Sequence, residues 1–476
     1  MNILKHKYRI LGVFLLIVVI VGVYNVYKPL PEGLSYEGEL VTAGNIRFLK
    51  DITYRDQEGK AYYEHEIFNE IVHIITSARQ TIILDMFLFS DLGGEPDGPV
   101  LRPLSGELTD LLVLQKKKYP QMQIIVITDP INTVYGGLEA DHLTRLEASG
   151  IDVAMTELDK MRDSNPLYSS IWRTLFRFFG NTRNGKLPNP LGEGRVSLRS
   201  YMRLLNFKAN HRKILIADSA DGYVGLVSSA NAHDGSSFHS NVAVRFSGPA
   251  VRDLIESERA VIAFSGGPEI NAVVPEDTVA GQMRMRLLTE SKIRTGIINT
   301  IEKTGQGDMI RMVMFYLSHR DIIRALKNAH HRGVDIRIIL DPNKDAFGRE
   351  KNGIPNRQVA NELHKSGIAV KWYDTRGEQC HAKFIATTSG AGSSNLIIGS
   401  ANFTRRNLND LNLETDVYVE GPSKDPLFQE VDDYFTRLWE NHSQAVFTLP
   451  FAVYEDTSST KKILYFVMEL LGVSTF

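Results

Sequence analysis

One pattern of strands and turns occurs twice in this chain, and that repeat limits the fold more than any other feature. The first copy contains the segments 81–91, 123–130 and 147–153, and the second contains 309–320, 335–342 and 364–370. Short β-branched runs bounded by turn signals are typical of buried strands in a largely parallel sheet. Helical patterns such as residues 320–333 lie between them, which indicates βαβ units. The sequence therefore predicts an α/β fold of two duplicated α-β-α halves with mostly parallel central sheets.

The repeat also sets the predicted domain boundaries. We expect a first half at 61–270 and a second half at 271–450. Residues 28–60 are predicted to be a linker, and residues 451–476 an apolar tail that docks on the core or rests at a membrane interface. The first copy carries an insertion at 154–208 that the second copy lacks. We expect the two halves to differ mainly there.

The N-terminal segment is predicted to cross a membrane once. Residues 10–27 carry no charge, and as a helix they would span roughly 27 Å, close to the hydrocarbon core of a bilayer. The positive-inside rule places residues 1–9 in the cytoplasm and the catalytic region outside it. This orientation is predicted from three basic residues, Lys5, Lys7 and Arg9. A cleaved signal peptide is the main alternative, but no small-residue cleavage motif follows the run.

The insertion has a distinctive composition. A net charge of -2 gives the whole chain no attraction to nucleic acid or anionic membranes, so any such attraction must be local. Residues 164–208 hold eight Lys or Arg against one acid, Glu193, and Trp172, Phe176 and Phe179 recur there at helical spacing. Such a segment can lie in a lipid headgroup layer. The alternative is a helix packed on the core with solvated arginines.

Two His-x-Lys motifs carry the predicted chemistry. The first contains His211 and Lys213, and the second contains His381 and Lys383. A Ser-x-Asn motif follows each one at nearly equal distance, giving Ser229, Asn231, Ser400 and Asn402. Residues i and i+2 of a strand share a face, so each His is expected beside its Lys. Cations and amides would neutralise phosphoryl oxygens, while one imidazole attacks phosphorus and the other protonates the leaving alkoxide.

These motifs resemble the HKD motifs of the phospholipase D superfamily, and the repeat is similar to that family over most of residues 60–445. The resemblance implies two α/β halves with the active site at their interface, and a phosphohistidine intermediate formed without a metal or other cofactor. It implies catalytic roles for the two His-Lys pairs. It also implies phosphate binding by the motif residues Ser229, Asn231, Ser400 and Asn402.

The second motif departs from this pattern, because Thr388 stands where an aspartate is expected. The first motif keeps its aspartate, Asp218. This residue is five positions beyond the Lys, so alternation points it away from the His face. We expect Asp218 to support the structure rather than to react. Other candidates are minor, since His233 and His239 are expected to be solvated and Cys380 to be buried.

Each histidine is expected to have a partner on its second ring nitrogen. Alignment of the halves places Asn241 beside His211 and Glu414 beside His381. A carboxylate favours the protonated ring, so we expect His381 to act as general acid and then base, and His211 as nucleophile. The tyrosyl-DNA phosphodiesterases of the same superfamily resemble this pattern, with an amide at the first site and a carboxylate at the second.

The motifs leave the substrate open. We expect a phospholipase D or cardiolipin synthase-like phosphatidyltransferase acting on phospholipid head groups, with water or an alcohol as acceptor, because the anchor holds the pocket beside a membrane. The alternative is a membrane-anchored extracytoplasmic nuclease or other phosphodiesterase, whose basic insertion follows a nucleic-acid backbone. A second alternative, slightly supported by Thr388, is an inactive lipid-binding scaffold.

Overall fold

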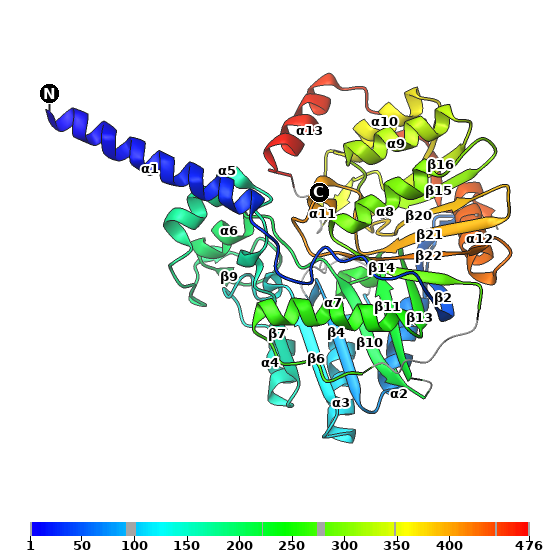
Figure 1. The fold of residues 1–476 in the computed structure, drawn as a ribbon, viewed down its shortest axis with the longest axis horizontal. Helices are drawn as coiled ribbons and strands as arrows, with labels where there is room; N and C mark the ends of the chain where they lie inside the picture. The colour runs from blue at the N-terminus through cyan, green and yellow to red at the C-terminus, as the bar shows by residue number, and fades with distance from the viewer. Residues whose placement is uncertain are drawn as a thin grey trace.

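The computed structural model describes residues 2–91, 101–220, 222–273, 281–346, 349–442 and 445–474, so Met1 and the last two residues of the predicted tail lie outside it. One long helix, α1 (Asn2–Tyr27), projects from a body built around two sheets (Figure 1). The stretch His6–Tyr27 is long and apolar enough to cross a membrane, with a mean hydropathy of 2.6. The predicted segment 10–27 lies within it.

Each half of the repeat forms the centre of a nine-stranded sheet. The first sheet contains, in spatial order, β23 (Ala445–Val446), β2 (Gly44–Asp56), β13 (Asn241–Ser247), β11 (Gly222–Ser228), β10 (Lys213–Ser219), β4 (Thr81–Met86), β6 (Gln123–Thr128) and β7 (Asp152–Met155), with β3 (Ala61–His65) paired to β2. The second contains β1 (Val41–Thr42), β14 (Arg284–Thr289), β22 (Thr415–Pro422), β21 (Ser393–Gly399), β20 (Lys383–Thr388), β15 (Met309–Met314), β16 (Asp335–Leu340), β19 (Ala369–Tyr373) and β24 (Thr448–Pro450).

The α/β fold is confirmed, but the sheets are mixed, and the prediction of mostly parallel sheets was wrong. Only β4, β6 and β7, and likewise β15, β16 and β19, are parallel neighbours in the two sheets as described. β10 is antiparallel to both β4 and β11. β11 begins at Gly222, directly after β10 ends at Ser219, and so short a connection can join only antiparallel neighbours. β20 and β21 repeat this arrangement in the second half.

Residues 28–60, predicted to be a linker, contain β1 and β2. β2 pairs with β13 on one side and with β3 on the other. Its apolar pattern is interrupted by charged residues, which obscured the strand in the sequence. Two of these, Arg47 and Lys50, form ion pairs with Glu70 and Glu66 of the neighbouring helix. The interruption therefore reflects surface ion pairs on a strand whose other face is buried.

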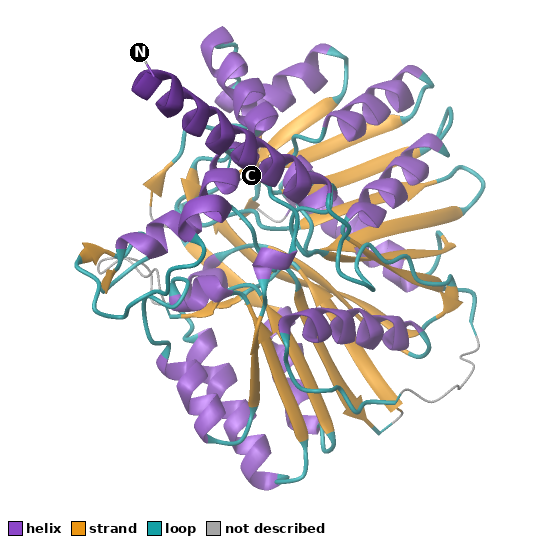
Figure 2. Ribbon diagram, turned by 60° about the vertical axis from the view of Figure 1, so that its left-hand side comes forward, coloured by secondary structure: helices purple, strands orange, loops and turns teal. Residues whose placement is uncertain are grey.

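Helices cover the outer faces of both sheets and also fill the space between them (Figure 2). The outer helices are α2 (Glu66–Ser77), α3 (Leu104–Lys118) and α4 (Asp141–Ala148) on the first sheet, and α8 (Ser291–Glu302), α9 (Arg320–His331) and α10 (Asn356–Lys365) on the second. Helices α7 (Ala250–Ser265) and α12 (Pro426–Glu440) contribute to the core shared by both sheets. Alternation along β10 serves two cores: Ile214 and Ile216 face the shared one, whereas Leu215 faces the outer one.

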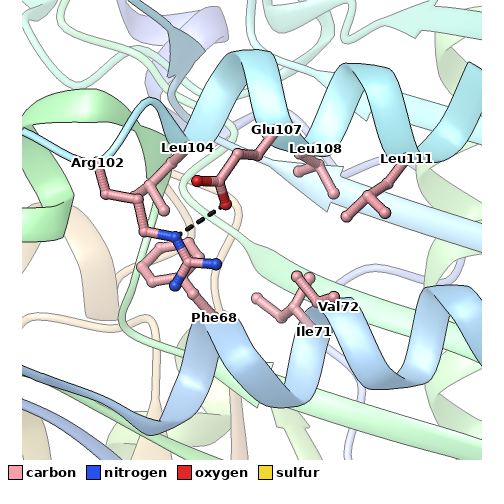
Figure 3. Close-up of a pocket in the computed structure, with 8 residues that line it drawn as sticks. All are labelled: Phe68, Ile71, Val72, Arg102, Leu104, Glu107, Leu108 and Leu111. Carbon is pink, nitrogen blue, oxygen red and sulfur yellow. Dashed lines mark hydrogen bonds and ion pairs between the residues drawn. The ribbon is translucent and has the colours of Figure 1, made fainter.

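A small pocket lies between α2 and α3, on the outer side of the first sheet (Figure 3). Apolar side chains such as Phe68 and Leu108 line most of it. At one end Arg102 Nε lies 2.8 Å from Glu107 Oε2. This ion pair satisfies both charged groups, and neither predicted histidine lines the pocket.

The insertion is partly packed on the body and partly exposed. Helix α5 (Pro166–Ile171) continues into a π-helical turn, η3 (Trp172–Phe176), and a further helix, α6 (Leu198–Leu204), follows. Trp172 is buried, whereas Phe179 is 65% exposed. The predicted single face of aromatic residues is therefore wrong, because the helix ends at Phe176 and Phe179 lies beyond it. The start of the segment packs on the body, and its end faces outward.

Asp218 supports the loop before β4. Its carboxylate accepts hydrogen bonds from the backbone N–H groups of Arg79, Gln80 and Thr81, at 2.7–3.1 Å. In the second half, the Thr388 hydroxyl lies 3.0 Å from Ser394 Oγ. These contacts fit the expected supporting role of the aspartate.

We expect Asp218→Ala to lower the free energy of unfolding by about 2 kcal/mol, because three N–H groups lose a charged acceptor. Chemical denaturation of the full chain in detergent would measure the change. Thr388→Ala is the matched control and should change it by less than about 0.5 kcal/mol. Equal effects of the two substitutions would contradict the supporting role.

Candidate active site

Two short parallel bridges join the halves directly beside the predicted histidines. Asn210 pairs with Leu413, and Ser240 pairs with Cys380. In each bridge, one residue precedes a motif histidine, and the other precedes the predicted partner residue of the opposite half. The residues that follow each bridge are therefore brought together across the interface.

The partners of the histidines are consequently crossed, and the predicted pairing was wrong. His211 Nδ1 lies 2.9 Å from Glu414 Oε1. His381 Nδ1 lies 3.2 Å from Asn241 Oδ1 and 2.9 Å from the Ser229 carbonyl oxygen. Alignment within each half could not show this, because each histidine takes its partner from the other half.

The two motif serines position these partners. Ser400 Oγ donates to Glu414 Oε2 at 2.5 Å, and Ser229 Oγ donates to Asn241 Oδ1 at 3.2 Å. Asn407 Nδ2 also donates to Glu414. A hydroxyl has one proton to donate, and in both serines that proton is already engaged. Both serines therefore position the partners of the histidines in this structure, and their expected phosphate-binding role stays a prediction.

The two motif asparagines differ from the serines. Asn231 and Asn402 are 4% and 5% exposed. Asn231 Oδ1 accepts a weak hydrogen bond from Leu88 N at 3.4 Å. Within the described residues, neither side-chain amide N–H group donates a hydrogen bond to a protein atom. Both amides keep the donors that phosphate binding requires, so that role stays a prediction.

Two phenylalanines that the sequence reasoning missed pack against the motifs. The rings of Phe87 and His211 have centroids 4.9 Å apart, as do those of Phe315 and His381. Each ring also lies under a motif lysine, with Lys213 Nζ 5.1 Å from the Phe87 centroid. The corresponding distance in the second half is 5.2 Å. The sequence did contain a signal for these two phenylalanines, because a Met-Phe pair stands at the end of the first strand of both copies.

Burial controls the protonation of all four motif bases. It lowers the pKa of His211 to about 4, although Glu414 acts in the opposite direction. Burial and the charges of Lys383 and Lys213 hold the pKa of His381 well below its usual value. Burial lowers the pKa of Lys213 to about 7 and that of Lys383 well below its usual range. The site therefore disfavours cations until an anion enters.

Glu414 keeps its charge in this environment. Burial opposes its ionisation, but the interaction with His211, including its hydrogen bond, and the nearby Lys213 hold the pKa of the carboxyl below its usual value. Its backbone N–H donates to Glu290 Oε1 at 3.1 Å. Glu290 in turn pairs with Arg212 Nη2 at 2.8 Å. The carboxylate that orients His211 is thus held at its backbone and its side chain.

Buried charges surround Arg212, the residue between His211 and Lys213. Arg212 also pairs with Glu258 at 2.9 Å and is fully buried. The equivalent residue of the second motif is Ala382, which lies in the shared core. The sequence reasoning missed this network because Arg212 occupies the variable position of His-x-Lys. It makes the two sites chemically unequal.

His239 belongs to the site, contrary to the expectation that it is solvated. Its ring centroid lies 6.2 Å from that of His381, and its Nδ1 accepts from Gln379 N at 3.2 Å. Burial lowers its pKa to about 3. His233 is also buried and bonds Ser90 O. Among the described residues, no group of His, Cys, Asp or Glu could hold a metal ion.

Known proteins resemble both the sequence and the fold. Residues 297–439 match a family model described as the phospholipase D-like domain of cardiolipin synthase. Cardiolipin synthases of Listeria monocytogenes and Listeria innocua are each 23% identical over 279 residues, covering 55% of this chain and 54% of theirs. The chain thus spans about half the length of the curated relatives it matches. The crystal structure of a phosphatidylserine synthase from Haemophilus influenzae shares the fold, at 11% identity and a TM-score of 0.57, over 95% of this chain and 97% of its own.

The crossed pairing predicts which histidine responds to a new carboxylate. We expect Asn241→Asp to raise the pKa of His381 by about 1 to 3, because a negative charge beside the ring favours its protonated form. Glu414→Gln should lower the pKa of His211 below about 4 for the opposite reason. NMR titration of selectively labelled histidines would measure both. A shift of His211 in the Asn241→Asp protein would contradict the crossed arrangement.

Proposed function

Because this chain belongs to the phospholipase D superfamily, we propose that it breaks and re-forms phosphodiester bonds in phospholipid head groups. The supporting observation is the meeting of two His-Lys pairs from opposite halves. All four bases are buried. Their charges interact across the interface, because the charges of Lys213 and His211 both lower the pKa of His381. A tetrahedral phosphodiester anion suits such a site because it stabilises all of these cations at once.

We propose His211 as the nucleophile, for a reason that differs from the sequence argument. Its Nε2 attacks phosphorus, and the bond from phosphorus to the head-group oxygen breaks. The phosphorylated ring then carries a positive charge for the lifetime of the intermediate, which Glu414 at 2.9 Å can neutralise. The amide of Asn241 offers His381 no such charge.

His381 is then the general acid and base. The bound phosphodiester raises its pKa, since an anion favours the imidazolium. The imidazolium gives its proton to the leaving alkoxide and returns to the neutral form. In the second step, neutral His381 takes a proton from water or an alcohol as that oxygen attacks phosphorus, and the bond between phosphorus and His211 Nε2 breaks. Water then yields phosphatidic acid, and an alcohol yields a new phosphatidyl ester.

The proposed location is the outer face of the cell membrane. α1 is apolar enough to span a bilayer, and the basic residues before its apolar run favour a cytoplasmic N-terminus. The catalytic body would then lie outside the cytoplasm, next to lipid. Phosphatidylglycerol is the first substrate to test, both as donor and as acceptor, because cardiolipin synthases are among the similar proteins.

The insertion gives less support to the nuclease alternative than its composition indicated. Arg173 and Lys208 are buried and both pair with Asp163. Arg203 lies near two acids at 3.6–3.9 Å, and Arg183 pairs with Glu139. Half of the eight cations are therefore engaged with acids. The four remaining cations would contact a phosphate backbone at fewer points than the composition indicated.

We expect the full chain in mixed micelles to turn over phosphatidylglycerol and to leave single-stranded DNA intact. His211→Ala should reduce the lipid turnover by at least about 10³-fold, as for loss of a nucleophile. The exposed residue His331 provides the control, since His331→Ala should retain full activity. Cleavage of DNA without lipid turnover would exclude the proposed substrate.

A substrate with a good leaving group separates the roles of the histidines. Phosphatidyl-p-nitrophenol needs no proton from an acid, so His381→Gln should release one equivalent of nitrophenol and then stop, with the phosphatidyl group bound to His211 through its phosphate. His211→Gln should give no such burst. Mass spectrometry at alkaline pH would locate the phosphate. Modification of His381 in the His211→Gln protein would reverse the proposed roles.

A further inference from the structure

Exposed hydrophobic side chains outside α1 are concentrated on two segments. Among the described residues, all but four of the large ones belong to the insertion or to residues 463–473. The exceptions are Tyr63, Leu114, Val273 and Val453. In the insertion, Phe178 is 74% exposed and Phe179 65% exposed. A distribution this uneven marks an interaction surface rather than scattered surface residues.

The second segment is the helix α13 (Ser459–Leu471). One of its attachments to the body is Tyr465, whose buried hydroxyl donates to Ser318 O at 3.0 Å. Five other apolar side chains of this helix remain exposed: Ile463, Leu464, Phe466, Val467 and Leu470. Leu470 is 79% exposed. Packing on the body therefore leaves most of the helix's apolar surface uncovered.

The insertion packs against the end of α1, and the C-terminal end of α13 approaches the insertion (Figure 1). In the insertion, Asp163 N donates to Asn25 O of α1 at 3.0 Å. Gly22 approaches α5 so closely that an added Cβ would lie 3.0 Å from Ser170 Cβ. At the other segment, Gly472 lies directly against the Ser164 carbonyl. One continuous region therefore joins the end of α1, the insertion and α13.

We propose that the insertion and α13 form a second contact with the bilayer that α1 crosses. The depth is consistent, because Gly22 lies about 7.5 Å along the helix from Tyr27. Interfacial segments bury their apolar face by about 5–10 Å. This surface rests on the proposal that α1 spans the membrane, and it adds a defined orientation of the catalytic body.

Charge also favours a lipid surface as the occupant. Arg177 stacks on the exposed ring of Phe178, with its guanidinium carbon 5.1 Å from the centroid. Lys186, Arg195 and Lys462 are exposed around the same two segments. Aromatic and aliphatic side chains mixed with cations suit the headgroup layer of an anionic membrane.

The same surface is connected to the catalytic site through the short helix α11 (Arg405–Leu408). Arg405 Nη1 donates to the Glu469 carbonyl of α13 at 3.2 Å. Two residues later, Asn407 donates to Glu414. Only about one turn of helix therefore separates a membrane contact at α13 from the Glu414 carboxylate. The contact would hold the site at a fixed height above the lipid.

Fluorescence quenching in vesicles can test this surface, because the single native cysteine, Cys380, is fully buried. Introduced cysteines in the full chain, Phe179→Cys and Leu470→Cys, would carry an environment-sensitive fluorophore. The vesicles contain phosphatidylglycerol and phosphatidylcholine with a spin-labelled chain near the headgroup. Leu114→Cys is the matched control, since Leu114 is 60% exposed on α3, far from α1 (Figure 1). Val13→Cys, in α1, reports membrane insertion.

We expect the spin label to quench the fluorophores at 179 and 470 several-fold more than the one at 114. If the label at 13 is quenched but either 179 or 470 matches 114, the surface is overturned and the spanning helix stands. If the label at 13 is also unquenched, both proposals fail. Protection of 179 and 470 from aqueous iodide without quenching by lipid would indicate a protein partner, and would equally overturn the lipid contact.

Discussion

The hydrogen bond between His211 and Glu414 crosses from one half of the molecule to the other, and the arrangement of the site depends on it. It forms because the Asn210–Leu413 bridge aligns the two backbones one residue earlier. The equivalent bridge brings Asn241 to His381. Neither half alone contains a histidine with its own partner. The shared core between the sheets, which includes α7 and α12, therefore positions the candidate active site as well as stabilising the fold, because it fixes this register.

Much of the fold could be predicted because repetition is visible in one sequence. The two copies of strand, helix and motif indicated the α/β halves and the four motif bases. The relative direction of neighbouring strands was harder to predict, because buried parallel and antiparallel strands show the same apolar pattern. The short connection from Ser219 to Gly222 was the available signal, because it excludes a crossover. β2 was missed because Arg47 and Lys50 interrupt its pattern with surface ion pairs.

The partners of the histidines could not be predicted by aligning the halves, because that comparison places each residue within its own half. Asn241 and Glu414 were found, but they were assigned to the wrong rings. The positioning contacts of the serines were missed for a related reason: the spacing of the serines from the histidines was visible, but the atoms that accept their hydrogen bonds were not. Arg212 shows a further limit. A variable motif position gave no indication that two buried carboxylates surround it.

The crossed partnership has an evolutionary consequence. In a symmetric dimer of identical halves, both histidines would necessarily face the same partner residue. Joining the halves in one chain removes that restriction, and each partner can then mutate without altering the opposite pair. This freedom allows a carboxylate beside one ring and an amide beside the other. Selection would therefore couple position 211 with 414, and 241 with 381, so that covariation in descendants of this gene would run between the halves rather than within them.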